Sequence, residues 1–313
     1  MRKHLGTILK IGITLLALLY VSTRVDFADI GQRLLQAKPG WVVMGFVLVN
    51  SSLVVRAFRW RLLLQGIGAP IKFGRLVSLY FAANFFNSVL PSGFSGDVVR
   101  AVEAAQDVPA ETAAGTVLVD RATGLLALFM IGLAALPFRP DNFSQTLFWQ
   151  TTAVCLIGLI GGFAVLEGRL VHLFGRWVPA RLRPAWAKVA GVITAVQACG
   201  WTAVWQAIGV SILFNFMQIS WFAAAGLALG YQVPFSHYIL VIPFLSIAIL
   251  LPSIGGLGIR ESLAPALFAS AGLVGEQAVA LTLLVFAIER LSGFLGAPIY
   301  ILGTLRRSGS RQV

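Results

Sequence analysis

Residues 90–100 read Leu-Pro-Ser-Gly-Phe-Ser-Gly-Asp-Val-Val-Arg, and residues 251–261 read Leu-Pro-Ser-Ile-Gly-Gly-Leu-Gly-Ile-Arg-Glu. A second matching pair follows these stretches, because residues 120–124 read Asp-Arg-Ala-Thr-Gly and residues 289–293 read Glu-Arg-Leu-Ser-Gly. Two related patterns so far apart in the chain indicate an internal duplication. Both place proline, glycine and charged residues inside apolar sequence, which is typical of the interrupted helices that transporters carry at the middle of a membrane.

The composition indicates a membrane protein. Of the 313 residues, 58% are hydrophobic and only 12% are charged, too few charges to cover a water-soluble globule of this size. A membrane-spanning helix needs about 20 apolar residues, and six predicted spans meet this condition: 5–22, 39–56, 110–138, 146–166, 202–229 and 276–303. The first run could instead be a cleaved signal peptide, but no small-residue cleavage site follows it, and we expect it to be retained.

Two further apolar regions, 73–108 and 238–272, are interrupted near their middle. A proline inside a helix removes a hydrogen bond and clashes with the preceding turn, and glycine permits backbone conformations that other residues avoid. Each region is therefore predicted to form a helical hairpin that enters and leaves the membrane on one side. The expected tips contain Pro91, Ser92, Gly93 and Gly96 in the first hairpin, and Pro252, Ser253, Gly255, Gly256 and Gly258 in the second.

The basic residues predict the orientation. The chain has 24 Lys and Arg against 12 Asp and Glu, but the basic residues cluster between apolar runs, which favours a topology signal over nucleic-acid binding. We expect residues 169–188, the tail 304–313 and both termini to be cytoplasmic. The remaining cytoplasmic cluster is predicted to be a loop that holds Arg56, Arg59, Arg61, Lys72 and Arg75.

The predicted fold is therefore an all-α polytopic membrane protein with eight membrane elements, six spans plus two re-entrant helical hairpins. Residues 1–313 form a single membrane domain. An odd number of spans separates the two hairpins, so the halves, about 1–140 and 145–303, form an inverted repeat. Topology alone does not distinguish a re-entrant hairpin from two complete spans.

Eight charged residues fall inside the apolar segments, where one charge at the membrane centre costs about 2.5–3.5 kcal/mol. They are Asp97, Arg100, Asp120 and Arg121 in the first half, and Arg260, Glu261, Glu289 and Arg290 in the second. Each set is neutral, which suggests a mutually compensated network. Asp97 and Arg100 are three residues apart and share one face of a helix, whereas the sequence leaves the other pairings open.

We predict that these eight residues, together with Asn87, form a substrate site. Arg100 and Arg260 lie beside glycine-bearing breaks, where a helix amino terminus and an arginine suit an anion such as a phosphate headgroup. The two acid-arginine pairs on the long spans could instead only hold those spans against the hairpin tips.

Three amide side chains are expected to form structural hydrogen bonds. Asn87 lies one turn before the first break and could bond the backbone groups that the break frees, which would hold the hairpin together. Asn215 and Gln218 lie in the fifth predicted span, where amides commonly bond across helices.

No catalytic motif or metal-binding pattern is present. Cys155 and Cys199 have no partner at metal or redox spacing and are expected to pack in the interior. His4, His172 and His237 fall at the terminus or in predicted loops. We therefore expect neither an enzyme nor a cofactor or bound metal.

With these motifs, the chain resembles the flippase-like family that includes the membrane portion of bacterial lysylphosphatidylglycerol synthases and many stand-alone proteins. The likeness covers nearly the whole chain. It rests on Asn87-x-x-Leu90-Pro91 with Gly96-Asp97-x-x-Arg100, on Asp120-Arg121-x-x-Gly124, on Leu251-Pro252 with Gly255-Gly256-x-Gly258-x-Arg260-Glu261, and on Glu289-Arg290.

The resemblance implies paired hairpins, the bacterial cytoplasmic (inner) membrane, and movement of a lipid or lipid-linked headgroup between leaflets. The implied partner is a membrane lipid, either a phospholipid or a polyprenyl-phosphate-linked lipid. Lipid aminoacylation is not expected, because the sequence lacks the soluble transfer domain of the larger synthases.

The leading functional prediction is a lipid flippase, in which an anionic or lipid-linked headgroup crosses through the charged site while the two hairpins gate opposite faces. A proton- or ion-coupled transporter of a small polar solute is one alternative, and a membrane partner subunit of a lipid-modifying enzyme is another. An intramembrane acid-base enzyme using Asp97 and Glu261 is the least favoured. The residues leave open whether the protein forms a homo-oligomer.

Overall fold

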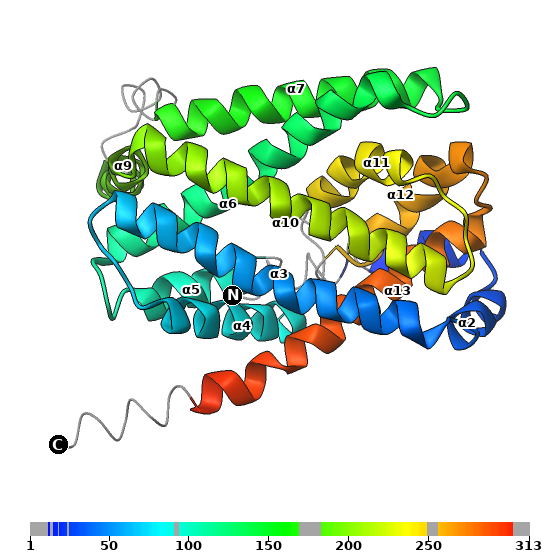
Figure 1. Cartoon of the computed structure of the whole chain (residues 1–313), viewed down its shortest axis with the longest axis horizontal. Helices are drawn as coiled ribbons and strands as arrows, with labels where there is room; N and C mark the ends of the chain where they lie inside the picture. Colours follow the sequence, from blue (N-terminus) through cyan, green and yellow to red (C-terminus); the bar gives the residue numbers. More distant parts are fainter. Residues whose placement is uncertain are drawn as a thin grey trace.

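The computed structural model describes residues 12, 15–17, 19–23, 25–90, 94–168, 183–248 and 256–302. Within these residues the chain is helical and has no strand, as the composition predicts (Figure 1). The helices are α2 (Phe27–Leu35), α3 (Pro39–Gly66), α4 (Phe73–Val89), α5 (Ser95–Ala104), α6 (Ala110–Ala135), α7 (Gln145–Glu167), α9 (Arg183–Ala198), α10 (Gly200–Ala228), α11 (Phe235–Ala248), α12 (Ile259–Phe268) and α13 (Gly275–Phe294), with short 3-10 helices η1 (Leu136–Phe138) and η3 (Ala269–Ala271).

Five helical segments of the described chain are long and apolar enough to cross a membrane. They are Pro39–Gly66, Ala110–Phe138, Gln145–Ala164, Gly200–Ala228 and Gly275–Leu302. They correspond to five of the six predicted spans. Of the remaining one, 5–22, residues 15–17 and 19–22 are helical, and most of the others lie outside the described residues.

The prediction for the carboxy-terminal end of α3 was wrong. We expected a span ending near residue 56 and then a basic loop, but the helix continues to Gly66. Residues 56–65 contain no proline or glycine, and the buried side chains of Trp60 and Leu63 keep this part of the helix packed against its neighbours. Arg56 and Arg59 therefore lie within a helix of the interior and not in a loop.

The two interrupted regions each contain two short helices in contact, α4 with α5 and α11 with α12. These helices have 17, 10, 14 and 10 residues. At 1.5 Å per residue the longest spans about 26 Å, less than the roughly 30 Å of a bilayer core. α4 ends at Leu90, whose extended backbone precedes Pro91 in the sequence. The breaks thus fall in the predicted places.

Most of the predicted tip residues lie outside the described residues: Pro91, Ser92, Gly93, Pro252, Ser253 and Gly255. Gly96, Gly256 and Gly258 are described, and the last two have positive φ angles of 86° and 83°. Only glycine adopts such angles readily. Entry of the helix pairs into a membrane from one side stays a prediction.

Helices of the two halves contact each other in matching pairs. α3 packs along α10 through the middle of the molecule (Figure 1). α6 contacts both α10 and α11, and α13 likewise contacts both α3 and α4. The long helix that follows each short pair therefore packs against the other half. An internal duplication predicts this repetition of neighbours.

Glycines allow α4 to approach two other helical segments closely. Gly96, at the start of α5, faces the carbonyl oxygen of Ala83 on α4 so closely that no Cβ would fit. Gly296 lies against α4 in the same way, because a Cβ on it would collide with the carbonyl group of Phe81, and Gly293 lies against the side chain of Ser88. The last helical segment and α4 therefore meet at the level of their backbones.

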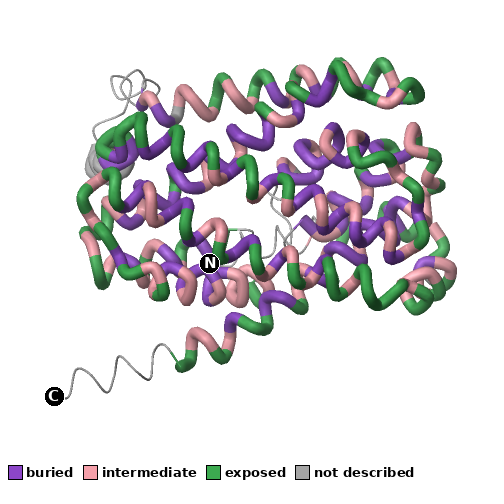
Figure 2. Tube along the Cα trace, viewed as in Figure 1, coloured by how far each residue is buried: buried purple, intermediate pink, exposed green. Residues whose placement is uncertain are grey.

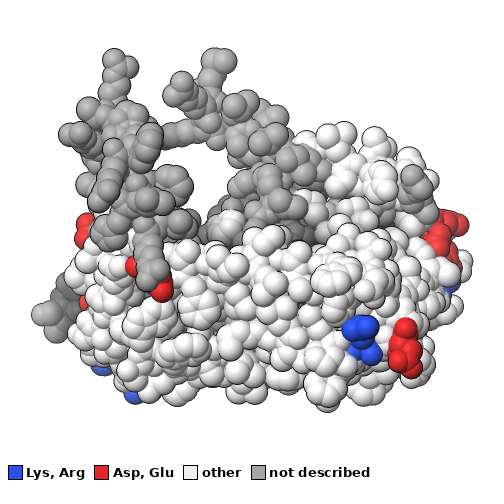
Figure 3. All heavy atoms as spheres, turned by 90° about the horizontal axis from the view of Figure 1, so that it is seen from above, with Lys and Arg blue, Asp and Glu red and all other residues white. Residues whose placement is uncertain are grey.

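The long helices present apolar side chains on their outer surface. On α7, the side chains of Ile157 and Ile160 are each 70% exposed, and Figure 2 shows that few residues of this helix are buried. On the face drawn in Figure 3, the coloured Lys, Arg, Asp and Glu atoms lie toward the two ends of the long axis, and the described residues visible between them are uncharged. Such an apolar outer face is expected where helices contact lipid, and the protein is an integral membrane protein.

The prediction that His237 lies in a loop was wrong. It is buried in the first turn of α11, and its Nε2 atom lies 2.9 Å from the carbonyl oxygen of Leu267 on α12. It therefore links the two short helices. Cys155 and Cys199 are buried, in agreement with the prediction that they pack in the interior.

The α4–α5 contact can be tested by adding one methyl group. Gly96→Ala should lower the unfolding temperature in detergent, because the new Cβ would meet the Ala83 carbonyl. Gly74→Ala is the matched control, since Gly74 has open space around it, and alanine is ordinarily favoured over glycine within a helix by about 0.5–1 kcal/mol. A Gly96→Ala protein as stable as the Gly74→Ala protein would contradict the close approach of the two helices.

Candidate functional site

Asp120, on α6, is fully buried and accepts hydrogen bonds from three other helices. Arg59 Nε on α3 lies 2.7 Å from Oδ1, and Arg100 Nη1 on α5 lies 3.0 Å from Oδ2. The hydroxyl group of Tyr80, on α4, also donates to Oδ2. Because both arginines are buried as well, the carboxylate and the two guanidinium groups compensate charges that would be costly alone.

Asp97 connects α5 to α6. Its Oδ1 accepts a hydrogen bond of 2.8 Å from Arg100 Nη2, the neighbour that the three-residue spacing predicts, and its Oδ2 accepts one from Arg121 Nε. Arg100 thus bridges Asp97 and Asp120. The four charged residues predicted from the first half are all brought together.

Aromatic rings cover the bridging arginine. The Cζ atom of Arg100 lies 4.2 Å from the centre of the Tyr80 ring and 4.9 Å from that of Trp60. These distances are within the range of cation–π attraction. Arg100 is therefore held in place by two carboxylates and two rings.

The second half repeats one of these contacts. Arg260, on α12, forms an ion pair with Glu289 on α13, with 2.9 Å between Nη1 and Oε2. An arginine on the second short helix again meets a carboxylate on the following long helix, as with Arg100 and Asp120. Glu261 has a different contact, because its Oε2 accepts a hydrogen bond of 2.6 Å from the backbone nitrogen of Gly258. It closes the first turn of α12.

Asn87 joins the two arms of the first helix pair and also contacts the second half. Its Oδ1 accepts a hydrogen bond of 2.7 Å from the backbone nitrogen of Gly96 and lies 3.2 Å from Ser95 Oγ. Its carbonyl oxygen accepts a hydrogen bond from Arg290 Nη1 on α13. The expectation that Asn87 bonds backbone freed at the break is confirmed.

The fifth predicted span carries the expected interhelical bonds. Asn215 Nδ2, on α10, donates to the carbonyl oxygen of Gly124 at 3.0 Å, and Gln218 Nε2 donates to Ser246 Oγ at 3.4 Å. A similar amide bond occurs on the other side of the molecule, where Ser292 Oγ on α13 donates to Asn50 Oδ1 on α3 at 3.0 Å.

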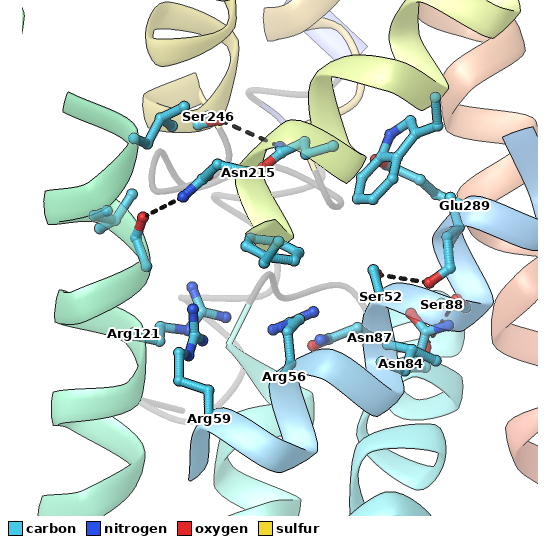
Figure 4. Close-up of a pocket in the computed structure, with 18 of the residues that line it drawn as sticks. Ser52, Arg56, Arg59, Asn84, Asn87, Ser88, Arg121, Asn215, Ser246 and Glu289 are labelled. Atoms are coloured by element: carbon cyan, nitrogen blue, oxygen red, sulfur yellow. Dashed lines mark hydrogen bonds between the residues drawn. The ribbon is translucent and has the colours of Figure 1, made fainter. Parts of the chain in front are cut away.

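A cavity of about 240 Å³ lies where these helices meet (Figure 4). Its wall includes residues of both halves, from α3, α4, α6, α10, α11, α12 and α13. In the view of Figure 4, Arg59 and Arg121 lie on one side, Glu289 on the other, and Arg56 between them. The polar residues of the wall are Ser52, Arg56, Arg59, Asn84, Asn87, Ser88, Arg121, Asn215, Gln218, Ser246, Arg260, Glu289 and Arg290.

The charged residues of the interior do not sum to zero. The neutral network predicted from eight charged residues was therefore wrong. Arg56 and Arg59 join the set, so six arginines accompany four carboxylates, a formal surplus of two positive charges. All 12 Asp and Glu residues fall within the described part of the chain, and within that part Arg56 and Arg290 form no ion pair with any of them. Both line the cavity.

Arg56 is held by rings and not by an anion. Its Cζ atom lies 5.0 Å from the centre of the Tyr80 ring and 5.2 Å from that of Phe214. Its Nε atom is buried and has no hydrogen-bond partner within the described residues. The side chain is thus positioned, charged and available to an anion.

Sequence reasoning missed Arg56 and Arg59 because it treated every basic cluster between apolar runs as a loop. The signal was present, since the two arginines are three residues apart, share one helix face and precede further apolar residues up to Leu64. Arg100, predicted to meet the anion, lies outside the cavity wall and is paired with two carboxylates. Among the predicted residues, Asn87, Arg121, Arg260, Glu289 and Arg290 do line the cavity.

The family of the chain follows from its match to known sequences. The model for the lysylphosphatidylglycerol synthase transmembrane region matches residues 7–295. The chain belongs to this family. The match spans both helix pairs and every residue of the cavity wall.

Two known proteins are similar to this member of the lysylphosphatidylglycerol synthase transmembrane family. A UPF0104 membrane protein of Methanothermobacter thermautotrophicus is 26% identical over 307 residues, which cover 88% of this chain and 85% of that protein. The glycosyltransferase AglD of Haloferax volcanii is 30% identical over 131 residues, which cover 39% of this chain but only 21% of that protein. The family match and the first of these relatives support an integral membrane protein.

Replacing the central carboxylate should destabilise the protein strongly. Asp120→Asn leaves two buried arginines short of one negative charge, and we expect a loss of about 3–5 kcal/mol of unfolding free energy. Asp29→Asn is the control, because Asp29 and its partner Arg33 are each about one-third exposed and such a pair contributes at most about 1 kcal/mol. Denaturant unfolding in detergent measures both changes, and equal losses would show that Asp120 does not organise the four helices.

Proposed function

We propose that this protein moves an anionic or lipid-linked polar headgroup between membrane leaflets through the cavity at the junction of its two halves. The observation that carries this proposal is the surplus of two positive charges around the cavity, with Arg56 and Arg290 lacking a carboxylate partner in the described chain. A charge at membrane depth is costly unless it is paired or faces a cavity. A visiting anion would supply the missing partner.

The roles of the charged residues follow from their contacts. Arg56, Arg121, Arg260 and Arg290 border the cavity and would contact the anion. Asp97 would position Arg121 from behind the wall, and Asp120 would hold Arg59 beside it. Arg100 takes a positioning role in this scheme, in place of the anion contact inferred from sequence.

An inverted repeat would let the two helix pairs open the cavity to opposite sides. The matching neighbours of α6 and α13 support it, and so do the two similar amide bonds, Asn215 with Gly124 and Asn50 with Ser292. We propose that each helix pair is a re-entrant hairpin gating one face. We also propose that the protein lies in the cytoplasmic membrane with both termini on the cytoplasmic side.

A second candidate is a membrane subunit that works with a lipid-modifying enzyme. The partial likeness to a glycosyltransferase favours it, because the matching 131 residues are a minor part of that protein. Under this candidate the cavity would hold a lipid for a partner and would not carry it across the membrane. Lipid bound to the purified protein without any movement between leaflets would favour the subunit.

Translocation can be tested in vesicles that contain the purified full chain. Phosphatidylglycerol and phosphatidic acid labelled on an acyl chain are reporters, and a reductant that cannot cross the membrane destroys the outer dye. We expect the dye of both leaflets to disappear when the protein is present and only the outer dye in empty vesicles. Failure to move either lipid, with the protein folded and inserted, would reject the proposal.

Arg56→Gln should slow this translocation about tenfold, the effect of one lost hydrogen bond to a charged group. Arg61→Gln is the matched control, because Arg61 lies on the same helix but outside the cavity, over the ring of Phe73. Thermal unfolding of both variants establishes that they are folded. Equal rates for the two variants would remove Arg56 from the pathway.

A further inference from the structure

Three buried N–H groups in the cavity wall have no hydrogen-bond acceptor within the described residues. They are Arg56 Nε, Arg260 Nε and Trp221 Nε1. Arg260 is 1% exposed and Trp221 is 5% exposed. A buried donor without an acceptor costs about 1–3 kcal/mol, so three such groups around one space indicate that something else supplies the acceptors.

The buried side-chain atoms of the wall that lack a partner within the described residues are all donors. Of its described residues, none has a buried oxygen atom without a partner, and the Glu289 carboxylate is bound to Arg260. A ligand that satisfies these three donors must accept several hydrogen bonds. Oxygen atoms of a phosphate group have this character.

The number of arginines without a carboxylate partner indicates the charge of the ligand. Two arginines of the cavity wall, Arg56 and Arg290, form no ion pair within the described residues, and they come from different halves of the chain. Among the segments outside the described residues, 91–93 and 249–255 adjoin the short helices, and neither contains an ionisable residue in the sequence. The surplus charge at the site is therefore independent of how these segments lie.

We propose that the headgroup recognised by this cavity ends in a terminal phosphate, as in a lipid phosphomonoester or a lipid diphosphate. This inference rests on the proposed function and specifies its substrate. A terminal phosphate has three acceptor oxygens and about two negative charges above its second pKa of about 6. A phosphodiester headgroup such as phosphatidylglycerol has one negative charge. An aminoacylated lipid adds an ammonium group, which would face arginines.

The rest of the wall suits the chain that carries the phosphate. Val49, Leu53, Leu125 and Phe214 border the same cavity. They place apolar surface beside the guanidinium groups. The first carbon atoms after the phosphate would lie against them, which a free inorganic phosphate cannot do.

A matched pair of ligands tests the proposal without altering the protein. Dodecyl phosphate and its methyl ester have the same chain, but the methyl ester has one negative charge and lacks a terminal phosphate. Binding to the purified full chain in a neutral detergent is measured by calorimetry, with inorganic phosphate as a third probe. At about pH 8 we expect dodecyl phosphate to bind about tenfold more tightly than the methyl ester, and at about pH 5 the difference should vanish because the phosphate loses its second charge.

Variants of cavity residues test whether dodecyl phosphate binds in the cavity. Arg56→Gln should weaken dodecyl phosphate about tenfold and reduce its advantage over the methyl ester, whereas Arg61→Gln should change neither. Trp221→Phe removes one N–H group and keeps an aromatic ring, so it should weaken dodecyl phosphate while the unfolding temperature stays close to that of the parent. Equal binding of the two esters at about pH 8, or equal binding of inorganic phosphate and dodecyl phosphate, would overturn the proposal.

The two proposals fail in different ways. Transport of labelled phosphatidylglycerol without preference for the monoester in binding would leave the proposed function intact and reject the terminal phosphate. Preferential binding of dodecyl phosphate without movement of any lipid in vesicles would support the terminal phosphate and reject translocation.

Discussion

The arrangement of the charged interior depends on one buried carboxylate. Asp120 accepts hydrogen bonds from Arg59, Arg100 and Tyr80, which belong to three different helices, and its own helix is a fourth. Such a group is favourable only while all its partners stay in place. Asp120 therefore sets where α3, α4 and α5 lie relative to α6, and with them one side of the cavity.

The two halves have corresponding helices, but these helices carry different charged residues. Arg100 with Asp120 and Arg260 with Glu289 are equivalent contacts, yet only the first half adds two arginines from α3. The corresponding helix of the second half, α10, contributes Asn215, Gln218 and Trp221 to the cavity wall and no charged residue. The surplus of positive charge is thus a consequence of this difference between α3 and α10.

The sequence predicted the elements well and the site in part. Proline and glycine locate the breaks at 91 and 252, and apolar runs locate five spans, because these features act over a few neighbouring residues. The extension of α3 through Arg56 and Arg59 was missed although their spacing is compatible with one helix face, because an arginine beside an apolar run suits either a loop or a buried ion pair. The ion pair of Arg59 with Asp120 on another helix distinguishes the buried position from a loop. These two residues are 61 positions apart in the sequence.

The glycine contact between the last helical segment and α4 has a consequence for motion. Because Gly293 and Gly296 contribute no side chain to the crossing, a shift of one helix against the other would have to rearrange only side chains of α4, such as Ser88. The barrier to such a shift then comes mainly from the polar bonds beside it, such as Arg290 with the Asn87 carbonyl. Binding of an anion by Arg290 would compete with that bond, so occupancy of the cavity and the freedom of the crossing are thermodynamically linked.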